Sequence, residues 1–405
     1  PLADAPGNTA GILIPSVGCP LGCNFCSTSA MFGGKGKSVN FFETGDDLFE
    51  VMDRIAADLK TQSFFVLDEN FLLHRKRALR LLELIEQHRK HWSLYVFSSA
   101  RVLQSYTMEQ LVRLGISWVW MGLEGKKSRY AKLNGVDTDT LVKTLQSHGI
   151  RVLGSSIIGL EHHTPENIQD VIDEAVAYNT DFHQFMLYTP IEGTPLYAEH
   201  QAKGTLIPES ELSPADVHGQ YRFNYHHPHI KNGQERQLIL EAFNRDFAVN
   251  GPSLARLIRT TLNGWLRYKK HPDQRIRARF AKNTLALRTS YAAGVWAMRK
   301  WYKGDDRIFG QLNLLLSRLV KEFGWTTRIM ARLIGQFLFR RMKKEERRLA
   351  QGWAYEPASF YELNDAAKAL AASTEKPWKT QSLEKIAQMA AEQTAQAATA
   401  QVGPQ

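Results

Sequence analysis

The chain has 405 residues, 43% of them hydrophobic and 23% charged, which is the composition of a folded globular protein. Its length suits two domains, or one large barrel with an appended region. No window approaches 18 consecutive apolar residues, so a membrane-spanning helix is not expected, and the first residues do not have the pattern of a signal peptide. Three clustered cysteines are not a secreted disulfide framework, so we expect a cytoplasmic protein.

The positive charge is concentrated in one part of the sequence. Residues 251–350 contain 24 Lys and Arg against 6 Asp and Glu, a balance of +18. The whole chain carries +10, so the remaining residues sum to −8. Such an asymmetry indicates that the basic region has a role of its own.

The first half of the chain alternates between short apolar runs and amphipathic helical stretches. The predicted strands are 11–14, 63–67, 94–97, 116–120, 152–158 and 182–187. The predicted helices are 46–60, 74–90, 107–114, 138–148 and 165–178, the last beginning at Thr164-Pro165. This alternation predicts a parallel sheet joined by right-handed crossovers. The pattern alone leaves open whether the sheet is doubly wound or a curved partial barrel.

These patterns divide the chain into four regions. Residues 1–198 are predicted to form the α/β core, and residues 199–250 a loop-rich connection. Residues 251–350 form a basic helical domain, and residues 351–405 an Ala- and Gln-rich tail that is a frayed helix or disordered.

All three cysteines of the chain, Cys19, Cys23 and Cys26, lie within one loop after the first predicted strand. A disulfide between such close neighbours would be strained and would leave one thiol over. A structural zinc site requires four ligands, and there is no second cysteine pair. The spacing instead suits three corners of a cubane iron–sulfur cluster whose fourth iron has no protein ligand.

The segment GCPLGCNFC, with Phe25 before the third cysteine, resembles the cluster motif of the radical S-adenosylmethionine (radical SAM) superfamily. The resemblance covers about residues 11–198. It implies an α/β fold, a partial (β/α)6 TIM-like barrel followed by a mainly α-helical C-terminal region. It also implies that S-adenosylmethionine (SAM) chelates the open iron of a 4Fe-4S cluster held by Cys19, Cys23 and Cys26. One electron, from a reductant such as flavodoxin or ferredoxin, then splits SAM to methionine and a 5′-deoxyadenosyl radical.

The resemblance also implies a set of SAM contacts, to which Phe25 belongs. Asp68 and Glu69 occupy the place of the segment that binds the SAM amino group, although a solvated acid pair at a helix N-terminus is the alternative. Arg101 would pair with the SAM carboxylate, or is a surface arginine. Glu124 would bind the ribose hydroxyls, with Gly125 standing where a serine is usual.

The last two predicted strands complete this set. The backbone around Ile158 and Gly159 corresponds to the segment that flanks adenine, and Tyr188 is placed to face the cleft. We assign no catalytic acid, base or nucleophile. Near the end of this region, the cluster His226, His227 and His229 is interpreted as a loop against the barrel mouth rather than a metal site.

The stretch from KLNG (132–135) to TPLY (194–197) looks most like the cobalamin-binding branch of the superfamily. That branch consists mostly of methyltransferases, with some oxidative cyclases, and normally has an N-terminal corrinoid domain. We expect cobalamin to be used if such a domain lies upstream of Pro1, and a lipid-like or other unactivated substrate to be methylated. The alternative function is a non-catalytic iron–sulfur protein that transfers electrons or acts as a scaffold.

Residues 311–348 mix large apolar side chains with Arg and Lys. Leu312, Leu316, Leu319 and Phe323 can share one helix face, and Ile329, Leu333 and Phe337 repeat the stripe after Gly324. One interpretation is a helix pair that packs on the barrel and exposes a basic face. The other is a peripheral contact with an anionic membrane surface, which would place the protein on the inner membrane face. Nucleic acid ranks lower, because no RNA-binding motif accompanies the charge.

Overall fold

The computed structural model describes residues 10–123, 136–212 and 221–352. Residues 1–343 form one compact unit and residues 344–405 a second, of which only 344–352 are described. Most of the predicted tail, from residue 353 onward, therefore lies outside the described residues. The elements discussed below belong to the first unit, except for the end of the last helix.

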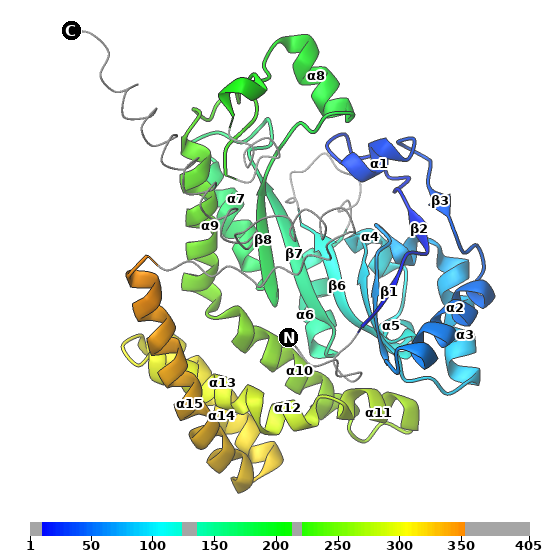
Figure 1. Cartoon of the computed structure of the whole chain (residues 1–405), viewed down its shortest axis with the longest axis vertical. Helices are drawn as coiled ribbons and strands as arrows, with labels where there is room; N and C mark the ends of the chain where they lie inside the picture. The colour runs from blue at the N-terminus through cyan, green and yellow to red at the C-terminus, as the bar shows by residue number, and fades with distance from the viewer. Residues whose placement is uncertain (1–9, 124–135, 213–220, 353–405) are drawn as a thin grey trace, which may run out of the picture. The chain divides into compact units, whose positions relative to one another are not determined.

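A six-stranded sheet in which every neighbouring pair is parallel forms the centre of the first unit (Figure 1). The strands are β1 (Gly11–Leu13), β4 (Ser63–Val66), β5 (Ser93–Phe97), β6 (Ile116–Gly122), β7 (Arg151–Ile158) and β8 (Phe182–Leu187). Their order in the sheet is β1-β4-β5-β6-β7-β8, the same as along the chain. A doubly wound sheet reverses its strand order at a switch point. This sheet does not reverse, so the predicted partial barrel is confirmed and the doubly wound alternative is excluded.

The side chains of each strand alternate between the two faces of the sheet, so every strand presents an outward apolar set. Helices cover this outer face. These helices are α2 (Gly45–Asp58), α3 (Arg75–Gln87), α5 (Met108–Leu114), α6 (Thr138–Ser147) and α7 (Ile168–Ala177). The outward side chains of the central strands, such as Phe64, Val96 and Val119, are almost fully buried beneath them. The side chains of Thr44 and Thr107 form capping boxes that fix where α2 and α5 begin.

The inner face of the sheet carries a row of aromatic rings that are only half-buried. Phe65 on β4 contacts Tyr95 on β5, with ring centroids 4.7 Å apart. Phe97 on β5 stacks on Trp120 on β6 at 4.9 Å, and Trp118 contacts Phe182 on β8 at 5.8 Å. One face of the barrel wall is therefore apolar and aromatic, and it leads toward the carboxyl ends of the strands.

The structure adds short elements that the sequence patterns did not predict. They are the hairpin of β2 (Ser16–Val17) and β3 (Val39–Asn40), and the helices α1 (Ser27–Met31), α4 (Ala100–Gln104) and α8 (Pro195–Lys203). The start of α7 was predicted at Thr164-Pro165, but the helix begins at Ile168. The Thr164 carbonyl accepts bonds from the backbone N–H groups of Asn167 and Ile168, so the residues before α7 form a turn.

A chain of helices follows the barrel. They are α9 (Gln234–Asn250), α10 (Ser253–Tyr268), α11 (Gln274–Ala281), α12 (Thr284–Arg288), α13 (Ser290–Trp301), α14 (Asp306–Phe323) and α15 (Trp325–Ala350). The helices α10, α12, α13, α14 and α15 share a separate apolar core that includes Ile258, Leu287 and Leu319. In the described part of the chain, no helix is long and apolar enough to cross a bilayer.

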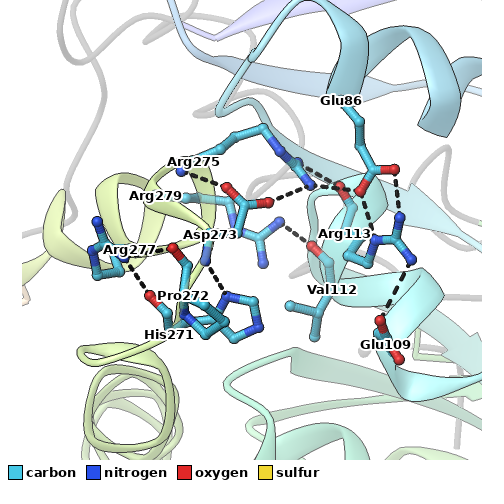
Figure 2. A network of polar contacts seen from close by, with 10 residues as sticks. All are labelled: Glu86, Glu109, Val112, Arg113, His271, Pro272, Asp273, Arg275, Arg277 and Arg279. Atoms are coloured by element: carbon cyan, nitrogen blue, oxygen red, sulfur yellow. Dashed lines mark hydrogen bonds and ion pairs between the residues drawn. The ribbon is translucent and has the colours of Figure 1, made fainter.

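Buried arginines attach this helical region to the barrel. Arg275 on α11 donates to the Arg113 carbonyl at 2.6 Å and to the Glu86 carboxylate at 3.2 Å (Figure 2). Glu86, on α3, also accepts two bonds from Arg113 on α5, both at 2.5 Å. Arg279 donates to the Val112 carbonyl from the same helix as Arg275. Part of the positive charge of residues 251–350 therefore serves the packing of α11 against α3 and α5.

Candidate functional site

The cysteine loop lies between β2 and α1 and depends on two glycines. Gly18 and Gly22 have φ angles of +83° and +65°, a region that disfavours other residues. A Cβ on Gly22 would lie 2.7 Å from the Cα of Lys35, so the loop closes tightly there. Cys26 caps α1 by accepting the Ser29 N–H on its Sγ at 3.5 Å, and the Ser29 hydroxyl donates to the Cys19 carbonyl at 2.7 Å. These bonds connect the first and last cysteines of the motif.

The three cysteines line one cavity of about 210 Å³ at the carboxyl ends of the strands. Its other lining residues are Leu21, Phe25, Glu69, Asn70, Phe97, Ser98, Ser99, Trp120, Gly122 and Ser155. All three cysteines are partly accessible rather than buried in a core. Parallel α/β barrels carry their chemistry at this edge of the sheet.

Three cysteine thiolates are a donor set suited to an iron–sulfur cluster. Within the described residues, no three His, Cys, Asp or Glu side chains converge closely enough to bind one ion. A cubane does not require such convergence, because each cysteine binds a different iron atom. The same finding offers no support for a metal at His226, His227 and His229.

Glu69 is the charged side chain of this cavity, and its carboxylate is incompletely satisfied. Its Oε2 atom is buried and has no hydrogen-bond partner among the described residues. Burial raises the pKa of Glu69 above its usual value, and the neighbouring Asp68 charge adds to the increase. A cation bound in the cavity would supply the missing partner and lower this pKa again. The site therefore fits the ammonium group of SAM.

Asp68 has a different environment from its neighbour. Its carboxylate forms a buried ion pair with Arg77 on α3 at 2.8 Å, and both side chains are at most 3% exposed. It also accepts hydrogen bonds from the Ser16 hydroxyl and, at 3.0 Å, from the Asn70 N–H. Asp68 does not line the cavity. The structure thus brings Glu69 of the predicted acid pair to the cavity and commits Asp68 to the packing of α3.

The cavity wall includes polar residues that the sequence reasoning missed. Asn70, which is buried, accepts on its Oδ1 from the Ser98 hydroxyl at 3.1 Å and the Ser99 N–H at 3.2 Å. This network connects the ends of β4 and β5, and Ser155 reaches the cavity from β7. Their position in the sequence could have indicated them, because Ser98 and Ser99 are the first two residues after a predicted strand.

Phe25 and Tyr188 lie together, but only Phe25 lines the cavity. Their rings meet edge to face, with centroids 6.0 Å apart. Tyr188, at the end of β8, is buried and its hydroxyl lies 3.2 Å from the side-chain amide of Asn24. The Leu196 N–H also donates to the Asn24 carbonyl at 3.0 Å. Tyr188 and the start of α8 therefore fix the cysteine loop in place.

Ile158 and Gly159 are buried outside this cavity lining. A Cβ on Gly159 would lie 2.4 Å from the Phe223 ring, and the Gly159 carbonyl accepts from the Tyr225 hydroxyl at 3.0 Å. The Nδ1 atom of His163 accepts from the backbone N–H groups of Gly159 and Leu160 at 3.1 and 3.2 Å. The end of β7 thus packs against the segment around Phe223 and Tyr225, in an apolar cluster against which Cys23 and Phe25 also pack.

The histidine cluster covers the same strand end. The Nδ1 atom of His227 accepts from the backbone N–H groups of His229 and Ile230, so its Nε2–H donates to the Leu160 carbonyl at 3.2 Å. Of the two remaining predicted contacts, Arg101 is not among the residues that line the cavity, and Glu124 stays a prediction. Arg101 is exposed on α4, and Glu124 lies outside the described residues.

The chain resembles several known proteins. Residues 13–175 match the family model of the radical SAM superfamily. Over 210 residues the chain is 28% identical to the uncharacterized methyltransferase PH0819 of Pyrococcus horikoshii, covering 50% of this chain and 44% of that protein. Over 197 residues it is 26% identical to the bacteriochlorophyllide d C-12(1)-methyltransferase of Chlorobaculum tepidum, covering 46% and 42%. The chain thus spans less than half the length of these two relatives.

Among solved structures, one neighbour is the radical SAM methyltransferase TsrM of Kitasatospora setae with cobalamin and a 4Fe-4S cluster bound. The match has a TM-score of 0.44 and 18% identity, and covers 67% of this chain and 60% of that chain.

The fold is a partial parallel α/β barrel, and the cavity lined by the three cysteines lies at the carboxyl ends of its strands. The match to the radical SAM superfamily, an enzyme superfamily, is carried by residues 13–175, and two proteins named as methyltransferases are among the relatives that this chain resembles.

Proposed function

We propose that this protein binds a 4Fe-4S cluster through Cys19, Cys23 and Cys26 and cleaves SAM reductively in the adjoining cavity. The observation that carries the proposal is the shared cavity, which brings three thiols and the unpaired carboxylate oxygen of Glu69 to one strand edge. A cluster held by three cysteines leaves one iron for a small molecule, and the carboxylate fits the amino group of SAM. The open iron and the Glu69 carboxylate would thus bind two parts of the same SAM molecule.

The protein's own residues would bind, orient and shield the reactants. The cluster, when bound, supplies the electron that converts SAM to methionine and a 5′-deoxyadenosyl radical. Glu69 would hold the SAM ammonium, and the network of Asn70 with Ser98 would keep the cavity wall in place. The stacked rings of Phe97 and Trp120 form an apolar wall that excludes water from the reacting groups.

We further propose that the radical is used for methyl transfer to an unactivated, lipid-like or otherwise apolar substrate. The names of the two relatives described above, both methyltransferases, support the reaction type. The aromatic inner face that continues from the cavity supports an apolar substrate, because flat apolar molecules pack well against such rings. Cobalamin and a flavodoxin- or ferredoxin-like reductant enter the proposal only through the resemblance to the cobalamin-binding branch.

The test is anaerobic reconstitution with iron and sulfide, followed by dithionite and SAM. We expect a brown, reducible cluster and the formation of 5′-deoxyadenosine. Cys23→Ala should abolish both, whereas Met31→Ala, at an exposed position of α1, should leave both unchanged. A reducible cluster that never yields 5′-deoxyadenosine would favour the alternative of an electron-transfer or scaffold protein.

Methyl transfer requires a separate measurement. S-adenosylhomocysteine should accumulate when hydroxocobalamin is added together with titanium(III) citrate, which reduces the cobalt to the cob(I)alamin form that accepts the methyl group of SAM. Formation of 5′-deoxyadenosine without any cobalamin-dependent S-adenosylhomocysteine would retain the radical chemistry and refute this part of the proposal.

A further inference from the structure

The helix α15 exposes a row of large apolar side chains. Trp325, Ile329, Leu333 and Phe337 recur every four residues, and their exposed fractions are 72%, 46%, 64% and 62%. The spacing places them on one face of the helix. Single exposed apolar residues are common on proteins, but a continuous row indicates a contact surface. We refer to these four residues as the α15 stripe.

The opposite face of α15 accounts for the packing of the helix. Thr327, Ala331 and Gly335 are its buried residues, also spaced by four. A Cβ on Gly335 would lie 2.7 Å from the Trp296 ring of α13, so the two helices are in close contact there. The helix is therefore fixed by small residues on its inner face. The α15 stripe is not needed for that packing.

A cationic cavity lies beside the stripe, between α13, α14 and α15. Its volume is about 470 Å³, and it is lined by Trp296, Arg299, Asn313, Leu316, Ser317, Val320, Lys321, Arg328 and Arg332. Four of these described residues are Lys or Arg and none is Asp or Glu. Arg328 and Arg332 each precede a residue of the stripe, so the cations flank the apolar row.

We propose that the α15 stripe and the cationic cavity together bind the surface of an anionic lipid bilayer. The two features have to be explained by one partner. A nucleic acid would use the cations but has no use for an exposed row of Leu, Ile and Phe side chains. An apolar protein surface would cover the row but would leave four cations in the cavity without counter-charge. A bilayer surface satisfies both, since acyl chains receive the apolar side chains and headgroup phosphates receive the cations.

The arrangement also accounts for charge that the fold does not use. Arg256 and Arg275 are buried in ion pairs with Asp246 and Glu86 and hold the helices on the barrel. The cations of the cavity lie instead at a surface between three helices. A lipid-like substrate would be delivered at the same interface, although the membrane contact does not depend on the proposed methyl transfer.

The test is sedimentation of the full chain with vesicles of phosphatidylcholine alone and of phosphatidylcholine mixed equally with phosphatidylglycerol. We expect binding to the anionic vesicles only, at about 0.1 M salt but not at about 1 M salt. Replacing two cations with Arg328→Gln and Arg332→Gln should weaken binding roughly 30-fold, as two headgroup contacts are lost. Leu333→Gln with Phe337→Gln should weaken it as well.

The matched control is Lys60→Gln with Lys76→Gln, which removes two exposed charges from the barrel. This control should bind as the unchanged protein does, and circular dichroism should show that all variants are folded. Equal binding to neutral and anionic vesicles, or unchanged binding of the arginine variant, would overturn the proposal. So would binding to a single-stranded RNA but not to vesicles, or a dimer in light scattering that Leu333→Gln with Phe337→Gln converts to monomer in the absence of vesicle binding.

Discussion

Two adjacent carboxylates, Asp68 and Glu69, follow the same strand and have opposite environments. Asp68 is saturated by Arg77, Ser16 and the Asn70 N–H, whereas one oxygen of Glu69 has no hydrogen-bond partner among the described residues. A buried carboxylate without a partner is costly, and a charge-assisted hydrogen bond from a ligand would offset that cost. Replacing the carboxylate with an amide should therefore have different effects at the two positions.

Glu69→Gln keeps the size of the side chain and removes its charge. We expect the KM for SAM to rise by at least about tenfold, because a hydrogen bond to a charged group contributes on the order of 2 kcal/mol. The cluster spectrum and the unfolding transition should change little. Asp68→Asn should give the reverse result, with the KM for SAM nearly unchanged and a stability loss of about 3 kcal/mol from the unpaired Arg77. An equal rise in KM in both variants would contradict this assignment.

Because burial raises the pKa of Glu69, we expect the affinity for SAM to depend on pH. The raised pKa means that its carboxyl group takes up a proton at a higher pH than an exposed glutamate does. A protonated carboxyl group cannot attract an ammonium, so SAM affinity should fall as pH decreases through this raised pKa. In Glu69→Gln this pH dependence should be absent.

At the scale of elements, the strands were predictable and the short connecting elements were not. All six strands of the sheet were located because a parallel strand is buried on its outer face and reads as a short apolar run. The β2–β3 hairpin, α1 and α8 are too short to show periodicity, and Gly18, Gly22 and Pro195 interrupt the pattern around them. These are the elements that position the cysteine loop, so the sequence predicted the scaffold better than the details of the site.

Some residues of the site could be predicted from the sequence and others could not. The three cysteines, Phe25 and Glu69 were nominated from the motif and line one cavity. Asn70, Ser98 and Ser155 were missed, because they are common residue types and only the register of neighbouring strands brings them together. Ile158, Gly159 and Tyr188 lie at the expected strand ends but face neighbouring loops, a property that no single-chain pattern encodes.

The loop after β7 contains a histidine whose neutral form the fold requires. The Nδ1 atom of His163 accepts two backbone N–H bonds, and burial lowers its pKa to about 3. The neighbouring rings of His162 and His227 lower it further when they are charged. An unfolded histidine has a pKa of about 6.5, so between these values the unfolded state binds more protons than the folded state. This contribution to stability is present in full above about pH 6.5 and is lost as pH falls.

The expected slope is up to about 1.4 kcal/mol per pH unit, so stability should fall by about 2 kcal/mol from pH 6.5 to pH 5 through His163. His163→Asn retains an acceptor for the two N–H groups and cannot become charged, so urea unfolding should show that this part of the slope is lost. His226→Asn, at an exposed position, is the control and should keep the slope. An unchanged slope in His163→Asn would show that the histidine is not neutral in the folded protein.

At the scale of the whole first unit, the barrel and the basic helices are coupled through a small number of charged side chains. Glu86 is central, since it binds both Arg113 and Arg275 and thereby joins α3, α5 and α11 (Figure 2). The side chain of Arg275 is 6% exposed, so its partners offset the cost of burying its charge. The helical region is therefore held by buried ion pairs as well as by apolar packing.

Glu86→Ala should lower the free energy of unfolding by about 2 kcal/mol, because it leaves the largely buried Arg275 with fewer partners. Glu83→Ala is the matched control on the same helix. Its carboxylate binds Arg80 at an exposed position and should contribute less than about 1 kcal/mol. Urea denaturation followed by tryptophan fluorescence measures both, and 5′-deoxyadenosine formation at a temperature where both variants are folded should be unchanged. If Glu86→Ala were no less stable than Glu83→Ala, apolar packing alone would hold α11 on the barrel, and the buried arginines of residues 251–350 would need a different explanation.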